Sequence, residues 1–189
     1  MSLLKIPEQG GLGANTCAER AQGPAPAVLR RMAAFLYEGV LLFGLVMVVG
    51  AVYSISVNQQ HGLRGREGMM AVQFLALALY FIWMWTHGGQ TLALKTWQLR
   101  VLSANGQPIS PRQALTRFML SWLWFMPAWI TAWAAEQLTG LHASGLLYGI
   151  MLAWIVIYAA LTRLLPQGQF LHDVICGTRI IDNRKQLPA

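Results

Sequence analysis

An arginine and a glutamate stand close together at the start of the first apolar segment. Arg31 and Glu38 are seven residues apart, a rotation of about 700° that places both on one helix face, roughly 10 Å apart along the axis. A carboxylate at the centre of a bilayer costs on the order of 3 kcal/mol, so such a residue normally faces the interior of a helix bundle. We therefore expect Glu38 to exchange a proton, hold a cation or form a structural ion pair.

The partner of Glu38 is expected to come from outside its own helix. Helical side chains lean toward the N-terminus and Arg31 extends outward, so a direct pair between the two is strained. A bridging water, an ion or a residue from another helix meets the carboxylate more easily. Lys95, Arg117 and His87 are all expected on the same side of the membrane.

His172 and Asp173 form a second polar pair near the end of the chain. Adjacent helical residues point about 100° apart, so the two cannot face one ligand without a turn between them. A metal site would need further donors that this region does not offer. Pairing of Asp173 with an arginine such as Arg31 or Arg117 is favoured, because it would close the C-terminal segment onto the helices. The alternative is a share in an ion or ligand site.

The chain contains no pattern that indicates catalysis. Cys176 follows His172 by four residues, but no neighbour marks it as an activated nucleophile. The two cysteines, Cys17 and Cys176, match neither a metal nor a redox spacing. We expect no enzymatic activity, no metal and no cofactor.

The elements that must position these residues are expected to be membrane helices. Of the residues 56% are hydrophobic and only 11% are charged, against roughly 25% charged in a soluble domain. Four apolar stretches, 32–57, 69–86, 118–135 and 145–164, approach or exceed the ~20 residues that cross a bilayer as a helix. The predicted fold is an all-α bundle of about four transmembrane helices, with a kink at Pro127 in the third.

Lysine and arginine are distributed unevenly between the connections, and this predicts the topology. Two connections contain only Arg64 and Arg66. The other twelve basic residues lie in the N-terminal tail, the connection between the second and third stretches and the C-terminal segment. They are Lys5, Arg20, Arg30, Arg31, Lys95, Arg100, Arg112, Arg117, Arg163, Arg179, Arg184 and Lys185. The positive-inside rule then places both termini in the cytoplasm of a multi-pass inner-membrane (plasma-membrane) protein. The net charge of +7 is expected to face lipid headgroups rather than nucleic acid.

The parts outside the spans are expected to be short. Residues 1–29, rich in Gly, Pro and Ala, read as a flexible cytoplasmic tail, and 182–189 as a short C-terminal tail. Alternation over 98–103 before Asn105-Gly106 predicts a short hairpin or an extended arm. Ser110 before Pro111 is a helix start.

Three blocks resemble a known family. RRMAAFLYE at 30–38, GGQTLALK at 88–95, and LHD at 171–173 with Gly177-Thr178 are similar to the RDD family of small integral membrane proteins, over about 30–181. The family is named for one arginine and two aspartates, which match Arg31, Glu38 and Asp173. Glu38 stands where the family usually has an aspartate. The resemblance implies transport of an unknown ligand.

Two functions follow from these residues. In the first, Arg31, Glu38 and Asp173, supported by Lys95, Arg117 and His172, bind a cation, a proton or a small polar ligand for transport. Four spans are few for a carrier, so we expect a homo-oligomer. In the second, a non-transporting scaffold or accessory subunit uses the same charges for helix packing. A water-accessible cavity at Glu38 would favour transport, and a dry Glu38 paired to arginine would favour the scaffold.

Overall fold

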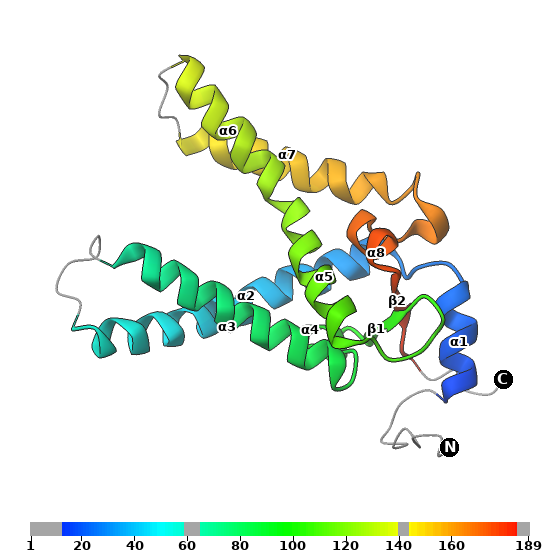
Figure 1. Ribbon diagram of the computed structural model, residues 1–189. Helices are drawn as coiled ribbons and strands as arrows, with labels where there is room; N and C mark the ends of the chain where they lie inside the picture. The colour runs from blue at the N-terminus through cyan, green and yellow to red at the C-terminus, as the bar shows by residue number, and fades with distance from the viewer. Residues whose placement is uncertain (1–12, 59–64, 140–143, 185–189) are drawn as a thin grey trace.

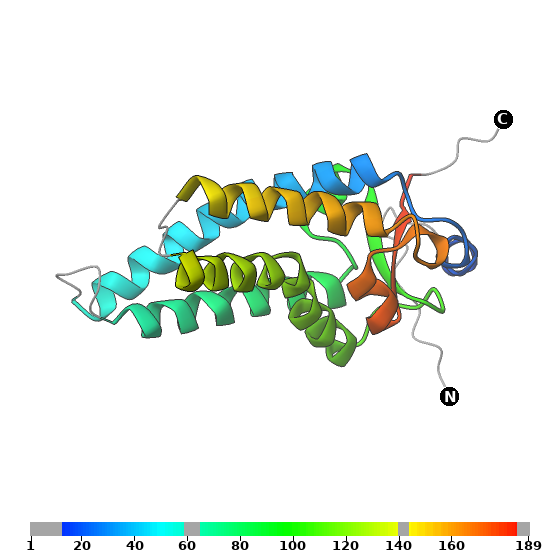
Figure 2. The ribbon, with the colours of Figure 1, turned by 90° about the horizontal axis from the view of Figure 1, so that it is seen from above.

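Two helical hairpins rise from a shared base. The computed structural model describes residues 13–58, 65–139 and 144–184 (Figure 1). The bounds of the first hairpin are α2 (Val28–Ser56) and α3 (Arg66–Thr86), and those of the second are α6 (Met126–Thr139) and α7 (Ser144–Leu161). Both hairpins extend from the base in the same direction (Figure 2), and their tips lie apart in Figure 1.

The base holds short elements from distant parts of the chain. They are α1 (Ala14–Gln22), α4 (Leu92–Thr96), β1 (Leu99–Ser103), η2 (Pro166–Gly168), α8 (Leu171–Cys176) and β2 (Thr178–Asp182). The strands β1 and β2 pair antiparallel, from Leu99 opposite Asp182 to Ser103 opposite Thr178. The first and last described elements, α1 and β2, therefore lie at the same end of the molecule.

Three of the described helices are long and apolar enough to cross a membrane. They are α2, α3 and the segment Pro111–Leu138, whereas the apolar part of α7 is the shorter Tyr148–Leu161. The predicted stretches 32–57, 69–86 and 118–135 coincide with the three long helices. The fourth, 145–164, is a helix only to Leu161.

The predicted break in the third span exists, but it precedes the proline. Helix α5 (Pro111–Ser121) is followed by the 3₁₀ turn η1 (Trp122–Trp124), and α6 then begins at Met126. Pro127 is thus the second residue of α6, where a backbone N–H has no intrahelical partner to lose. The predicted helix start at Ser110 is confirmed by a capping box with Gln113.

The prediction of an all-α fold is wrong in the base, where β1 and β2 form a two-stranded sheet. The extended arm predicted over 98–103 is present as β1, but its partner is β2 rather than the segment after Asn105-Gly106. Leu99 and Val101 are fully buried in this sheet. Pairing between segments so far apart depends on tertiary packing, which local alternation does not reveal.

The two predicted tails also need correction. Helix α1 occupies part of the predicted flexible tail, because Cys17 and Ala21, one turn apart, are buried against Leu102 and Ile181. Two apolar positions are too few for a visible helical period. At the other end, Asp182 belongs to β2 rather than to a tail. Residues 1–12 and 185–189 lie outside the described residues.

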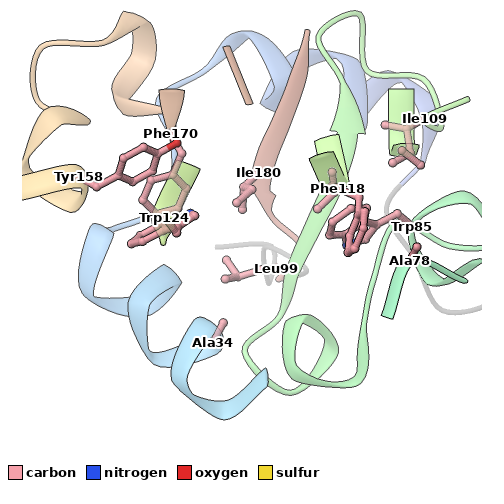
Figure 3. Packing of buried hydrophobic residues seen from close by; sticks show 12 residues of the cluster. Ala34, Ala78, Trp85, Leu99, Ile109, Phe118, Trp124, Tyr158, Phe170 and Ile180 are labelled. Atoms are coloured by element: carbon pink, nitrogen blue, oxygen red, sulfur yellow. The ribbon is translucent and has the colours of Figure 1, made fainter. Parts of the chain in front are cut away.

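The hydrophobic core lies at the base and joins both hairpins to the sheet. Figure 3 shows the rings of Trp124, Tyr158 and Phe170 gathered on one side of Ile180, and Phe118 with Trp85 on the other. Beyond the base, large apolar side chains of the helices are exposed, as a lipid-facing surface requires.

Candidate functional site

Glu38 is buried where α2, α3 and the start of α4 meet. The hydroxyl of Tyr80 on α3 donates a hydrogen bond to Glu38 Oε1 at 2.7 Å. The hydroxyl of Thr91 donates to Glu38 Oε2. Glu38 is 8% exposed, so both carboxylate oxygens are satisfied by protein hydroxyls rather than by bulk water.

The segment before α4 fixes the position of Thr91. Gly89 has a φ of +71°, which favours glycine, and its carbonyl accepts a hydrogen bond from Val101 N at 2.7 Å. The side chain of Gln90 donates to Leu99 O at 2.6 Å. Thr91 then caps α4 by accepting from Leu94 N at 3.3 Å. Strand β1 therefore determines where the Thr91 hydroxyl meets Glu38.

The described ion pairs do not include Glu38. Arg117 pairs with Asp173, and Lys95 is an exposed residue of α4. The structural ion pair considered for Glu38 is therefore not what the structure shows. Hydroxyl donors meet the hydrogen-bonding needs of a carboxylate but supply no opposite charge, so an ionised Glu38 at this position is costly.

Asp173 lies at the centre of a separate, fully buried cluster. Its Oδ1 accepts from Arg117 Nε at 2.8 Å and from the Thr178 hydroxyl at 2.7 Å. Arg117 comes from α5 and Thr178 from β2, so Asp173 connects α8 to both. Burial raises the pKa of Asp173, but the charge of Arg117 and the hydrogen bond from Thr178 outweigh it and hold that pKa below its usual value. Of the two arginines considered as partners, Arg117 makes the pair.

His172 faces Asp173 as a neutral side chain. Its Nε2 is 3.5 Å from Asp173 Oδ2, and burial lowers the pKa of His172 to about 4. The Tyr158 hydroxyl accepts from His172 N at 3.2 Å and lies 2.9 Å from His172 Nδ1. When that hydroxyl donates to Nδ1, the ring proton is on Nε2, on the side of Asp173. The two adjacent residues thus face each other rather than a shared ligand.

Arg31 holds the loop that leads into α8. Its Nη2 donates to Gly168 O at 2.8 Å, and its Cζ lies 4.4 Å from the centre of the Phe170 ring. Within the described chain, Nε and Nη1 of this buried side chain have no hydrogen-bond partner. Arg31 is therefore turned toward the C-terminal segment, and Glu38 has other partners.

The predicted site residues thus separate into two groups. Arg31, Asp173, Arg117 and His172 lie around α8, and Glu38 lies with hydroxyls that the sequence analysis did not single out. Thr91 carries a local signal, because it precedes the helical run of α4 as an N-cap residue. Tyr80 carries none, since it meets Glu38 across 42 residues.

Trp85 on α3 is a further residue of this cluster. Its ring is buried, and the Cζ of Arg117 lies 4.2 Å from its centre. The contact holds the arginine that pairs with Asp173, so Trp85 supports the cluster around α8.

A cavity of about 230 Å³ adjoins the Glu38 group. It is lined by Leu41, Leu42, Leu45, Tyr80, Met84 and Leu92. The lining is apolar apart from the Tyr80 hydroxyl, so the cavity does not provide a polar path to Glu38. A water-accessible cavity at Glu38 would have favoured transport, but this cavity is apolar. A Glu38 paired to arginine would have favoured the scaffold, but the partners of Glu38 are hydroxyls.

The long apolar helices and the buried charges define a small helical membrane protein with a mixed α/β base. The model of the RDD family matches residues 25–177, and the chain belongs to this family. The matched region contains Arg31, Glu38 and Asp173 and ends just before β2. No curated protein matches the chain, and no solved structure does.

Proposed function

We propose that this protein transports a proton or a small cation that binds reversibly at Glu38. The observation that supports this function is a buried acid in a membrane helix whose described partners are the hydroxyls of Tyr80 and Thr91. Protonation or a bound cation would supply the missing positive charge. We propose neither an enzymatic activity nor a nucleic-acid partner for this protein.

Both hydroxyls can serve either state of Glu38. Toward an ionised carboxylate they donate, as in this structure. Toward a protonated Glu38 or a cation, each hydroxyl can rotate and offer its lone pairs. Carboxylate and hydroxyl oxygens are also the ligand type that hard cations prefer. Arg31 and Asp173 have a positioning role in this scheme, because their contacts hold the base together.

The base is proposed to face the cytoplasm of the inner membrane. The excess of basic residues in connections at this end supports that orientation. Glu38 would then lie a short way into the membrane from the cytoplasmic side. The second hairpin exposes Trp129 and Trp133 on α6, and we propose that a homo-oligomer covers part of this surface.

A specific observation favours a second candidate, a non-transporting scaffold. Arg117, Asp173 and Thr178 tie α5, α8 and β2 together, and Arg31 ties α2 to Gly168. As a scaffold, the protein would use these charged contacts to keep the base folded. The base would then bind another membrane protein.

Flux measurements on purified protein in liposomes distinguish the two functions. Dyes sensitive to pH and sodium would report flux for the wild type and for Glu38→Gln. Glu67→Gln, at the exposed start of α3, is the matched control. Transport at Glu38 predicts that flux is lost in Glu38→Gln and kept in Glu67→Gln while both proteins remain monodisperse. A wild type without flux, or an active Glu38→Gln protein, would contradict it.

A further inference from the structure

The apolar cavity beside Tyr80 lies between membrane helices. Its walls come from α2 (Leu41, Leu42 and Leu45), α3 (Tyr80 and Met84) and α4 (Leu92). The cavity is partly open to the outside, and Leu92 on its α4 side is 55% exposed. We call this cavity the α2–α4 groove.

The size and lining of the groove restrict what it can hold. Pockets for complete small molecules usually measure about 300–1,000 Å³ and carry several polar groups that orient the ligand. The α2–α4 groove measures about 230 Å³, and the hydroxyl of Tyr80 already donates its hydrogen bond to Glu38. A flexible hydrocarbon segment fits such a space, whereas a polar metabolite would find no free partner in its lining.

A basic residue lies about one helical turn from Leu92 in the lining of the groove. Lys95 follows Leu92 by three residues on α4, and residues so spaced are neighbours on a helix surface. Lys95 is exposed at the base, where a lipid headgroup would lie if its chain entered between α2 and α3. Lipid tails are as apolar as the leucines of the groove, so burying a tail there gains little over leaving it in the bilayer. The headgroup contact must therefore supply much of the preference of the groove for a particular lipid.

We propose that the α2–α4 groove binds one acyl chain of an anionic phospholipid whose phosphate contacts Lys95. The chain would pack against Leu41, Leu45 and Met84 and against the ring of Tyr80. Because Tyr80 also donates to Glu38, the lipid would hold that ring in the position that serves Glu38. Lipid binding is measured without ion flux, so it stands or falls separately from transport.

Photolabelling in nanodiscs tests the site directly. The probe is phosphatidylglycerol with a diazirine on one acyl chain, and labelled peptides are identified by mass spectrometry. We expect labels to concentrate on Leu41, Leu45 and Met84. Leu45→Trp, which fills the groove, should reduce labelling of Met84 at least fivefold. Leu92→Trp, at the exposed mouth, is a second blocking variant should Leu45→Trp fail to fold.

The control for groove filling is Leu152→Trp, at a 65% exposed position on α7. It should leave labelling of the groove unchanged. Labels spread evenly over the exposed apolar residues of all helices would overturn the proposal. Absence of labels from the groove in a protein that elutes as a dimer would also overturn it, because it would assign the groove to a second copy of the chain.

The headgroup contact has its own test. With labelled phosphatidylglycerol in competition against phosphatidylcholine, Lys95→Gln should reduce the preference for the anionic lipid about fivefold, the equivalent of ~1 kcal/mol per basic residue. Arg163→Gln, which removes an exposed charge beyond α7, should leave the preference unchanged. Equal loss of label to unlabelled phosphatidylcholine and to unlabelled phosphatidylglycerol in the wild type would overturn the assignment of the phosphate to Lys95.

Discussion

Asp173 and Glu38 are both buried acids, and at the residue scale their neighbours give them different properties. Asp173 meets the charged Arg117 and a hydroxyl, whereas the described partners of Glu38 are two hydroxyls. An acid with a fixed cation remains ionised and stabilises the fold. An acid without one gains from taking up a proton or a cation.

Replacing Asp173 is expected to destabilise the protein strongly. Asp173→Asn leaves Arg117 buried without its countercharge, which costs about 3–5 kcal/mol. Equilibrium unfolding in detergent, followed by tryptophan fluorescence, measures this loss. Asp182→Asn is the control, because Asp182 pairs with Arg30 and Arg184 in a more exposed position. Equal destabilisation by the two variants would contradict the structural role of Asp173.

His172 predicts a pH dependence of stability. Its pKa in the folded protein is about 4, below the ordinary value of 6.5, so between these values the unfolded chain binds more protons. Stability should therefore be full above pH 6.5 and fall by about 1 kcal/mol for each pH unit below it, until about pH 4. Unfolding of the wild type and His172→Gln between pH 7 and 5 measures the effect. A wild-type slope that persists unchanged in His172→Gln would contradict this assignment.

At the scale of elements, the segment between α3 and α4 contacts both β1 and Glu38, so the position of β1 determines which group Glu38 meets. Gly89 contacts β1 through its carbonyl, Gln90 donates to the same strand, and Thr91 donates to Glu38. The block resembling the RDD family at 88–95 thus has a structural explanation, namely a close approach of backbone to a strand followed by a helix cap.

Two adjacent glycines test this explanation. A Cβ at Gly89 would lie 2.3 Å from Val101 O at a φ of +71°, whereas a Cβ at Gly88 would meet nothing within 4 Å. Gly89→Ala should therefore destabilise the protein by at least about 2 kcal/mol, from left-handed strain and the clash with β1. Gly88→Ala should be nearly neutral. Thermal unfolding of both variants in detergent compares them, and equal melting temperatures would contradict the close approach.

At the scale of the whole molecule, the sequence predicted the features that depend on local pattern. The lengths of the apolar stretches predicted the long helices. The expectation that a buried carboxylate is paired predicted an arginine as the partner of Asp173. The sheet was missed because β1 and β2 pair across most of the C-terminal half of the chain. Tyr80 was missed for the same reason, since its contact with Glu38 spans two helices.

Short elements were missed because they depend on packing. Helix α1 buries only Cys17 and Ala21, and its order comes from contacts with the sheet rather than from its own sequence. The base as a whole is assembled from segments that are individually too short to be stable. Its charged residues therefore join segments that are far apart in the sequence. Their spacing along the chain does not reveal this role.

Infrared difference spectroscopy of Glu38 tests the central claim most directly. The spectrum of the reconstituted protein is recorded while pH or sodium concentration is changed at constant ionic strength. Reversible binding at Glu38 predicts a protonated-carboxyl band that appears at low pH, is reduced by sodium or by raised pH, and is absent from Glu38→Gln but present in Glu67→Gln. A spectrum in which Glu38→Gln is indistinguishable from the wild type would contradict a proton- or cation-binding role for Glu38.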